Sequence, residues 1–185
     1  MLAYSTQKAA VMPGNAAFIR ADMLDFSLPQ KYDFAFITLG SLCAHNTADL
    51  FSHLRSVARA LNLGELYLMD WCIHFDPFTG QEDTWSIEQD GIQVTTHYAE
   101  RLIDAIEQRV EETIILEVLE DGVTRSFIER RINRVIFPQE FLQIIAHLPE
   151  LEFVGWWNNW DLDQPLDEIK DPKKISRPIT LLRKI

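Results

Sequence analysis

Two short apolar runs near the start of the chain constrain the fold more than any other feature. Residues 17–26 read Ala-Phe-Ile-Arg-Ala-Asp-Met-Leu-Asp-Phe, and residues 31–42 end in Leu-Gly-Ser-Leu. Both runs are rich in Phe and Ile and lack alternation, which is typical of strands buried on both faces of a parallel sheet. Ligands of open parallel sheets bind at the carboxyl ends of the strands. Asp22 and the segment from Thr38 through Leu39 and Gly40 to Ser41 are therefore predicted to lie at such an edge.

A helix and a third buried strand follow these runs. Asn46 or Thr47 can cap the helix with a side-chain oxygen, and Asn62-Leu63-Gly64 is predicted to end it. One apolar stripe at helical spacing comprises Leu50, Phe51, Leu54, Val57, Ala58 and Leu61. Residues 65–73 then form the strand. The order strand, strand, helix, strand predicts an α/β sheet with right-handed crossovers.

The pattern changes over residues 75–135. Four segments are predicted to be strands with one solvent-exposed face: residues 85–89, 91–98, 108–119 and 123–135. Asp90-Gly91 and Asp121-Gly122 indicate two hairpin turns. We interpret 75–135 as an antiparallel insertion that serves either as a cover or dimer surface, or as a lid that faces a substrate.

The two ends of the chain complete the prediction. Residues 2–11 are expected to form a short helix, which Pro13-Gly14-Asn15 stops. After the insertion, Pro138 begins a helix, and residues 151–157 and 178–183 form two strands. The connection between these strands, residues 158–177, is predicted to be a loop without a helix. This predicts an antiparallel pair at the edge of the sheet.

Length, charge and cysteine count limit the class of protein to which this chain can belong. At 185 residues, with 47% hydrophobic residues, the chain is expected to form one domain over residues 1–185. The net charge of −11 argues against nucleic acid as a partner. No apolar run approaches the about 20 residues that span a bilayer. Cys43 and Cys72 are too few for a disulfide framework, so we expect reduced thiols in a cytoplasmic protein.

Several segments together resemble one known family, the class I S-adenosylmethionine-dependent methyltransferases. They are Met-Leu-Ala-Tyr-Ser-Thr-Gln-Lys-Ala at residues 1–9, Ala-Asp-Met-Leu-Asp-Phe at 21–26, Tyr-Asp-Phe at 32–34 with Leu-Gly-Ser at 39–41, and Leu-Asn-Leu-Gly-Glu-Leu at 61–66. No single motif is specific, but their order and spacing match the family over nearly the whole chain. The resemblance implies a partial Rossmann-like methyltransferase sheet, with an antiparallel insertion and a hairpin-like C-terminal edge.

The resemblance also implies a cofactor and its contacts. S-adenosylmethionine would lie with Asp22 and Met23 beside its adenine, and with Thr38, Leu39, Gly40 and Ser41 along its other side. The family's Gly-rich loop and ribose-binding acid precede its "mLaya" helix, where this sequence starts. We therefore expect an N-terminally truncated member, or a misplaced start, that binds the cofactor weakly or not at all. The acceptor is expected to be a small molecule.

Two side chains are weak candidates for catalysis. His45 could act as a general base, since imidazole titrates near neutral pH, or it could be a polar residue that leads into the helix cap. Asp70, at the end of the third strand, could face a substrate amine or hydroxyl, or it could be a buried, hydrogen-bonded acid. His97 and Tyr98 could face the cleft. The sequence shows no metal-ligand spacing, P-loop or nucleophile elbow.

Other residues have more ordinary interpretations. Asp25 is expected to be a turn acid and Asp33 a structural residue before a strand. Trp156, Trp157 and Trp160 form an aromatic cluster, in the core or as a stacking site.

Without the family's first two strands, the strand at 32–38 needs a neighbour, because buried backbone groups must be paired. We expect residues 17–21 to pair with it directly, or a second copy of the chain to do so, which makes a homodimer possible. The alternative to an enzyme is a non-catalytic methyltransferase-like remnant that acts as an interaction or dimerisation module.

Overall fold

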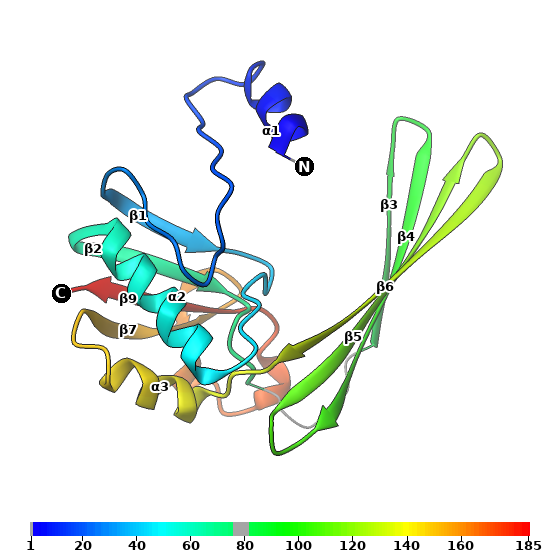
Figure 1. Cartoon of the computed structure of the whole chain (residues 1–185). Helices are drawn as coiled ribbons and strands as arrows, with labels where there is room; N and C mark the ends of the chain where they lie inside the picture. The colour runs from blue at the N-terminus through cyan, green and yellow to red at the C-terminus, as the bar shows by residue number, and fades with distance from the viewer. Residues whose placement is uncertain (1, 76–81) are drawn as a thin grey trace.

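The computed structural model of the protein describes residues 2–75 and 82–185, and its strands form two separate sheets (Figure 1). The first sheet has five strands in the order β1-β2-β9-β7-β8. Their bounds are β1 Tyr32–Ile37, β2 Leu61–Asp70, β9 Pro178–Lys184, β7 Leu151–Asn158 and β8 Asp161–Pro165. β1 and β2 are parallel, whereas β9 is antiparallel to both β2 and β7. The mixed α/β sheet predicted from the sequence is confirmed.

Two helices cover one face of this sheet (Figure 1). In α2 (Thr47–Ala60), the side chain of Asn46 accepts a hydrogen bond from the N–H of Asp49 at 2.9 Å, as the capping prediction required. α3 (Pro138–Ala146) begins at Pro138, also as predicted. Buried side chains from both helices and from β2, β7 and β9 form the main core, including Leu50, Leu54, Tyr67, Phe141 and Leu182.

The junction between α2 and β2 differs from the prediction. Gly64 does not end the helix: α2 ends at Ala60, and β2 begins at Leu61. Tyr32 pairs with Leu61 and Phe34 with Leu66, so three extra residues of β2 bulge out between these pairs. Gly64 lies in this bulge at φ +86°, a backbone conformation that glycine adopts without steric cost.

The second sheet is a four-stranded antiparallel meander, β3-β4-β5-β6. It consists of β3 (Glu82–Gln89), β4 (Ile92–Asp104), β5 (Arg109–Glu120) and β6 (Val123–Arg134), close to the predicted ranges. Asp90-Gly91 and Asp121-Gly122 form the two predicted turns, and all four residues have positive φ, as two-residue hairpin turns of type I′ require. Residues 76–81 of the predicted insertion lie outside the described residues.

The N-terminal part contradicts one prediction. Helix α1 (Leu2–Ala9) is present, but it buries no residue. Residues 17–21 form no strand and are exposed, with Phe18 42% and Ile19 51% accessible. Among the described residues, β1 pairs with β2 alone, so the expected pairing of 17–21 with β1 is wrong. The outer edge of β1 thus has no strand partner among the described residues, and the apolar run at 17–21 stays outside the sheet although that edge could accept it.

The C-terminal part is confirmed with one addition. β7 and β9 are antiparallel as predicted, but β9 lies inside the sheet. β8, from the segment predicted to be a loop, forms the edge, and two short 3₁₀ helices follow it at Leu166–Glu168 and Pro172–Lys174. In the described parts of the chain, every helix is too short or too polar to cross a membrane.

Candidate functional site

The loop after β1 turns sharply at the carboxyl edge of the first sheet. Leu39 and Gly40 both have positive φ, 57° and 61°. The Thr38 carbonyl accepts hydrogen bonds from the N–H and the hydroxyl of Ser41, at 3.2 and 2.6 Å. A Cβ at Gly40 would lie 3.0 Å from the carbonyl oxygen of Trp71. This position therefore requires glycine for two reasons, its positive φ and the lack of space for a side chain. The loop therefore presents an exposed Leu39 and Ser41 on a fixed backbone.

Asp70 holds this loop in place. It is the last residue of β2, and its side chain is fully buried. Its carboxylate accepts hydrogen bonds from the N–H of Leu39 at 2.9 Å, from Trp160 Nε1 at 3.0 Å, and from Arg177 Nε and Nη2 at 2.8 and 2.6 Å. Its carbonyl oxygen accepts the N–H of Gly40 at 3.1 Å. One residue thus joins the ends of β1 and β2 to the segment before β9.

These contacts decide what Asp70 can do. Burial alone would raise the pKa of Asp70, but the hydrogen bonds from Arg177, Leu39 and Trp160 outweigh it and hold the pKa below its ordinary value. A carboxylate with a lowered pKa, whose oxygens already accept four hydrogen bonds, is a poor proton acceptor for a substrate. The structure thus matches the alternative interpretation, a buried, hydrogen-bonded acid, and its role is to position the loop after β1.

The segment with Asp22 and Met23 is fixed against α2. The Met23 carbonyl lies 2.7 Å from Nδ1 of His53, and the N–H of Phe26 donates to the Ser56 hydroxyl at 3.2 Å. Asp22 itself is exposed, and its Oδ1 accepts the N–H of Leu24 at 2.9 Å, which makes it a turn acid. Met23 is 41% accessible, so both predicted adenine contacts are open to solvent. Asp25 pairs with Arg59 at 3.2 Å, in agreement with a structural role.

His53 is the residue here that sequence reasoning missed. It is buried in α2, with Nε2 2.7 Å from the Tyr67 hydroxyl and Nδ1 at the Met23 carbonyl. A neutral ring with hydrogen on Nδ1 satisfies both contacts, since Nδ1 then donates to the carbonyl and Nε2 accepts from the tyrosine. Burial lowers the pKa of His53, although the Met23 carbonyl opposes this, so burial favours the neutral form of the ring. Its place on the apolar side of α2 was the available signal.

His45 lies at the start of α2, where the sequence placed it. Its N–H donates to Oδ2 of Asp49 at 2.9 Å, and its side chain is exposed. It therefore leads into the helix cap, as the alternative interpretation stated, and its ring is open to solvent near the loop after β1.

Burial raises the pKa of Cys72 to about 12, so this thiol is protonated and poorly suited to act as a nucleophile.

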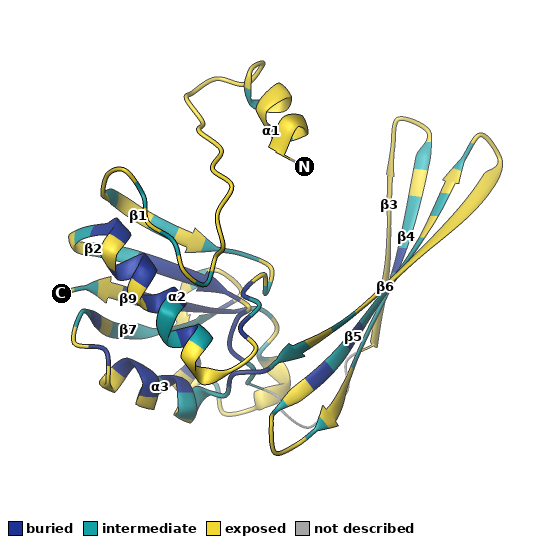
Figure 2. Ribbon diagram, in the orientation of Figure 1, coloured by how far each residue is buried: buried dark blue, intermediate teal, exposed yellow. Residues whose placement is uncertain are grey.

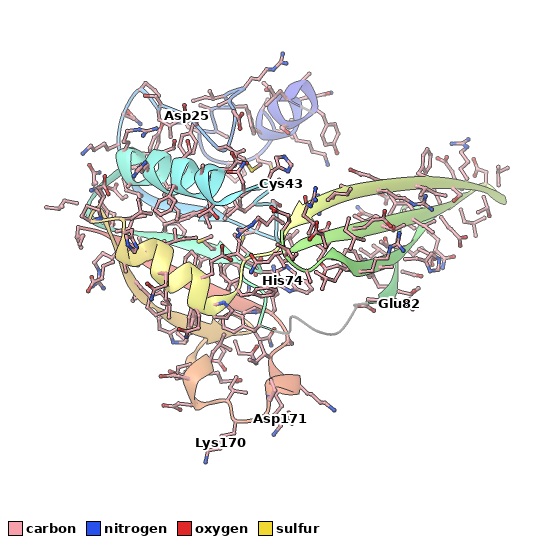
Figure 3. The ribbon with its side chains drawn as sticks, turned by 60° about the horizontal axis from the view of Figure 1, so that its bottom comes forward. Asp25, Cys43, His74, Glu82, Lys170 and Asp171 are labelled. Carbon is pink, nitrogen blue, oxygen red and sulfur yellow. The ribbon has the colours of Figure 1, made fainter. Side chains whose placement is uncertain are left out.

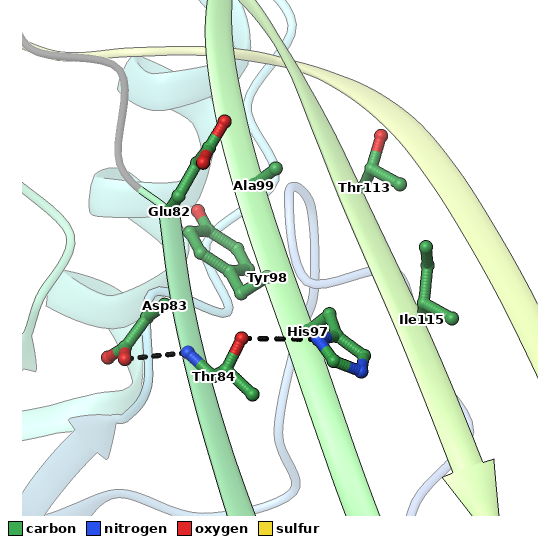
Figure 4. A pocket seen from close by; sticks show the side chains of 8 residues that line it. All are labelled: Glu82, Asp83, Thr84, His97, Tyr98, Ala99, Thr113 and Ile115. Atoms are coloured by element: carbon green, nitrogen blue, oxygen red, sulfur yellow. Dashed lines mark hydrogen bonds between the residues drawn. The ribbon is translucent and has the colours of Figure 1, made fainter.

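His97 and Tyr98 lie on opposite faces of the second sheet, because successive side chains of a strand alternate. His97 lines a shallow pocket of about 440 Å³, where its Nδ1 lies 3.1 Å from Oγ1 of Thr84 (Figure 4). Glu117 lies 3.6 Å from Nε2 of the same ring. Tyr98 also lines this pocket, whose lining residues all belong to β3, β4 and β5. None of them is a predicted cofactor contact, so the pocket does not unite His97 with those residues.

The tryptophans separate into different roles. Trp156 packs edge-on against Phe153 and Phe75, whereas Trp160 donates to Asp70. Within residues 2–75 and 82–185, no group of three or more His, Cys, Asp or Glu side chains is arranged to hold a metal ion.

Comparison with known proteins gives a structural likeness alone. No protein-family model matches the chain, and no curated protein matches its sequence. An S-adenosylmethionine-dependent methyltransferase from Clostridium acetobutylicum ATCC 824 superposes with a TM-score of 0.72 at 14% identity, over 98% of this chain and 69% of that one. DesVI from Streptomyces venezuelae superposes with a TM-score of 0.73 at 15% identity, over 97% of this chain and 69% of that one.

The sugar N-methyltransferase KedS8 from Streptoalloteichus sp ATCC 53650 gives a TM-score of 0.67 at 20% identity, over 99% of this chain and 67% of that one. The chain therefore has the fold of the class I S-adenosylmethionine-dependent methyltransferases, which confirms the fold that the sequence segments indicated.

Proposed function

We propose that the chain belongs to an S-adenosylmethionine-dependent methyltransferase that acts on a small molecule. The observation that carries this proposal is the loop after β1, fixed by Asp70 at the carboxyl edge of a methyltransferase-like sheet. The superposed KedS8 is a sugar N-methyltransferase, which supports a small polar acceptor. S-adenosylmethionine supplies an activated methyl group, so the protein's task is to bind, orient and exclude water.

We infer that the described residues supply one side of the site for this cofactor. We propose that Asp22 and Met23 contact the adenine and that Thr38, Leu39, Gly40 and Ser41 form the opposite wall. Both segments are held by buried groups, His53 for the first and Asp70 for the second, so their backbones are fixed before a ligand arrives. Among the described residues, α1 is followed directly by β1, and no glycine-rich turn joins a strand to a helix there.

Because helix N-termini and glycine-rich turns bind anionic groups, the described residues offer little for the carboxylate end of the cofactor. We therefore propose that this chain alone contacts the adenosine part of S-adenosylmethionine and binds the cofactor weakly. His45, with its exposed ring beside the loop after β1, stays our candidate for a general base, and its test is the pH profile of a His45→Gln variant once an acceptor is known.

Saturation-transfer NMR with S-adenosylhomocysteine tests the proposed side of the cofactor. We expect the adenine and ribose protons to receive more saturation from the protein than the homocysteine protons do. Gly40→Ala should abolish the effect, since its Cβ would meet the Trp71 carbonyl at positive φ. Gly14→Ala is the matched control, because Gly14 also has positive φ but faces open space. Equal saturation along the whole ligand, or an unchanged signal in Gly40→Ala, would contradict the assignment.

We also propose a homodimer formed through the second sheet. Cross-strand pairing puts Trp85 and Phe127 on one face, with Ile87 two residues from Trp85, and these side chains are 44, 56 and 62% accessible. Exposed apolar patches of this kind mark interaction sites, and a two-fold contact needs a single self-complementary patch. Sedimentation should show a dimer that Trp85→Ser and Phe127→Ser dissociate; a monomeric parent chain would exclude it.

We retain the cytoplasm as the proposed location, in keeping with Cys43 and Cys72, which are both free thiols.

A further inference from the structure

Four residues of the first sheet and its loops have an unusual backbone conformation. Among the described residues, seven that are not glycine have positive φ. Three of these lie in turns of the second sheet: Asp90, Gln108 and Asp121. The other four are Leu39, Trp71, Asn159 and Trp160. Bulky side chains rarely adopt this conformation, and residues that do so gather at functional sites.

Three of these four residues carry a large apolar side chain and are held around Asp70. The backbone N–H of Leu39 and the indole N–H of Trp160 donate to opposite oxygens of its carboxylate, at 2.9 and 3.0 Å. Trp71 directly follows Asp70, and its carbonyl oxygen lies 3.0 Å from where a Cβ of Gly40 would be. We call Leu39, Trp71 and Trp160 the edge platform.

The edge platform brings together three segments of the chain. Leu39 belongs to the loop after β1, and Trp71 follows β2, which is parallel to β1. Figure 3 marks this end of the sheet with Cys43 and His74, which lie a few residues beyond Leu39 and Trp71. Trp160 reaches Asp70 from the turn between β7 and β8. The edge platform is therefore continuous with the loop proposed to contact the cofactor.

Packing does not explain large side chains at these positions. Leu39, Trp71 and Trp160 are 65, 41 and 45% accessible, so they contribute little to the core. Trp160 is the second residue of a two-residue hairpin turn, a position that favours glycine. Glycine or asparagine would adopt positive φ at lower cost in all three places. Exposed apolar side chains that also strain the backbone indicate contact with a ligand.

The polar groups beside the edge platform already have partners within the protein. Asp70 accepts four hydrogen bonds, two of them from Arg177, so the two charges offset each other. The Ser41 hydroxyl donates to a carbonyl of its own loop at 2.6 Å. Such a surface offers little to an ionic group or to the hydroxyl groups of a sugar, whereas indole rings and an aliphatic side chain suit a flat apolar ring. The Arg177 guanidinium, 5.6 Å from the ring centroid of Trp160, further fixes this indole.

Resting on the proposed methyltransferase function, we propose that the edge platform binds an aromatic ring of the methyl acceptor. Leu39 belongs both to the platform and to the loop proposed to contact S-adenosylmethionine, so a ring bound there lies next to the cofactor. Trp71 and Trp160 supply the stacking surfaces that select an aromatic ring. The acceptor class is thus a small, uncharged aromatic compound.

A first test asks whether these side chains serve the fold. Leu39→Asn and Trp71→Asn keep positive φ at lower cost, so we expect the Tm of each variant to stay within about 2 °C of the parent or to rise by up to about 4 °C. Trp156→Asn is the control, because Trp156 packs against Phe153 in the core, and its Tm should fall by at least about 6 °C. A fall beyond about 2 °C in Leu39→Asn or Trp71→Asn would make that side chain structural and overturn the proposal.

A second test uses phenol as the probe. In ¹H–¹⁵N spectra of the full chain with labelled tryptophan, we expect phenol to shift the indole N–H signals of Trp71 and Trp160 in a saturable way, with a Kd of about 10 mM or below. Trp71→Asn should identify one signal by its loss and should weaken phenol binding at least about fivefold. Trp85 is the internal control, because it is 44% accessible on the second sheet, and its signal should not move.

Cyclohexanol and methyl β-D-glucopyranoside are the matched compounds, the first without an aromatic face and the second with the ring of a sugar. An equal response to either of them, an equal shift of the Trp85 signal, or no saturable response to phenol would overturn the aromatic site. S-adenosylhomocysteine titrated in the same spectra keeps the two proposals apart. Phenol binding without binding of that compound contradicts the methyltransferase proposal alone, and the reverse result contradicts the aromatic site alone.

Discussion

The two sheets of this molecule are stabilised in different ways. The first is covered by α2 and α3 and buries large side chains such as Tyr67 and Leu182, whereas both outer strands of the second, β3 and β6, are exposed along most of their length (Figure 2). The first therefore depends on a few buried residues, with Asp70 joining several segments. The second depends on its backbone ladder and on cross-strand pairs. In the first sheet, substitution of a few buried residues should therefore lower the free energy of unfolding strongly. In the second sheet, substitution of any one exposed side chain should lower it only a little.

The largest effect is expected at Asp70. Asp70→Ala leaves Arg177 without its partner and frees the N–H of Leu39, so the free energy of unfolding should fall by about 3–5 kcal/mol. Urea unfolding followed by circular dichroism measures this. A loss below about 1 kcal/mol would mean that the contacts of Asp70 are no stronger than a surface ion pair.

A matched pair of apolar truncations sharpens the comparison of the sheets. Leu182 in β9 is fully buried, and Leu182→Ala should lower the free energy of unfolding by about 2–5 kcal/mol. Ile128 in β6 is 63% accessible, and Ile128→Ala should change it by less than about 0.5 kcal/mol. Similar losses from both variants would show that the second sheet has a buried face in solution.

The third prediction concerns His53. His53→Phe leaves the buried Tyr67 hydroxyl and the Met23 carbonyl without a partner, so we expect a loss of about 1–3 kcal/mol. Adding Tyr67→Phe to this variant should restore part of the loss, because the stranded hydroxyl is then removed as well. A double variant as unstable as the sum of the two single variants would contradict direct coupling.

His53 also gives stability a pH dependence. Its pKa in the folded state lies below the ordinary 6.5, so below that pH the unfolded chain binds the proton more readily. The contribution of the neutral ring is complete above about pH 6.5 and declines as the pH falls toward the folded-state pKa. Urea midpoints between about pH 5 and 7 should fall more steeply with acid for the parent than for His53→Phe. Equal slopes would mean that His53 titrates normally.

The smallest effect is expected at an exposed pair of the second sheet. Arg101 and Glu111 face each other across β4 and β5 at 2.8 Å, and the arginine side chain is 72% accessible. Arg101→Ala should cost only about 0.2–1 kcal/mol, and the difference should disappear in about 1 M salt. A salt-independent loss above this range would show that the pair carries more than a surface contact.

Local sequence patterns correctly predicted the hairpin turns and the helix start, which depend on the conformation of a few neighbouring residues. Asp90-Gly91 and Asp121-Gly122 identified two hairpins because two-residue turns of type I′ need positive φ at both positions. Asn46 and Thr47 were the two candidate caps for α2, and Asn46 is the cap. Asp33 was expected to be structural, and its carboxylate accepts a hydrogen bond from Asn62 at 2.7 Å.

Contacts between distant segments could not be predicted in this way. Asp70 was identified as a residue at the sheet edge, but its partners Trp160 and Arg177 are 90 and 107 residues away. Residues 17–21 had the composition of a buried strand, yet composition cannot say whether the segment joins a sheet, and here it leaves the outer edge of β1 unpaired among the described residues.

Two-dimensional ¹H–¹⁵N NMR of the full chain during titration with S-adenosylhomocysteine tests the central claim most directly. The account predicts saturable shifts confined to residues 22–24 and 38–42, with a Kd weaker than about 100 μM, because we propose that these residues form only one side of the cofactor site. Shifts centred on the pocket beside His97, or no saturable shift at all, would contradict the placement. Binding tighter than about 1 μM would contradict the view that these residues supply only one side of the site.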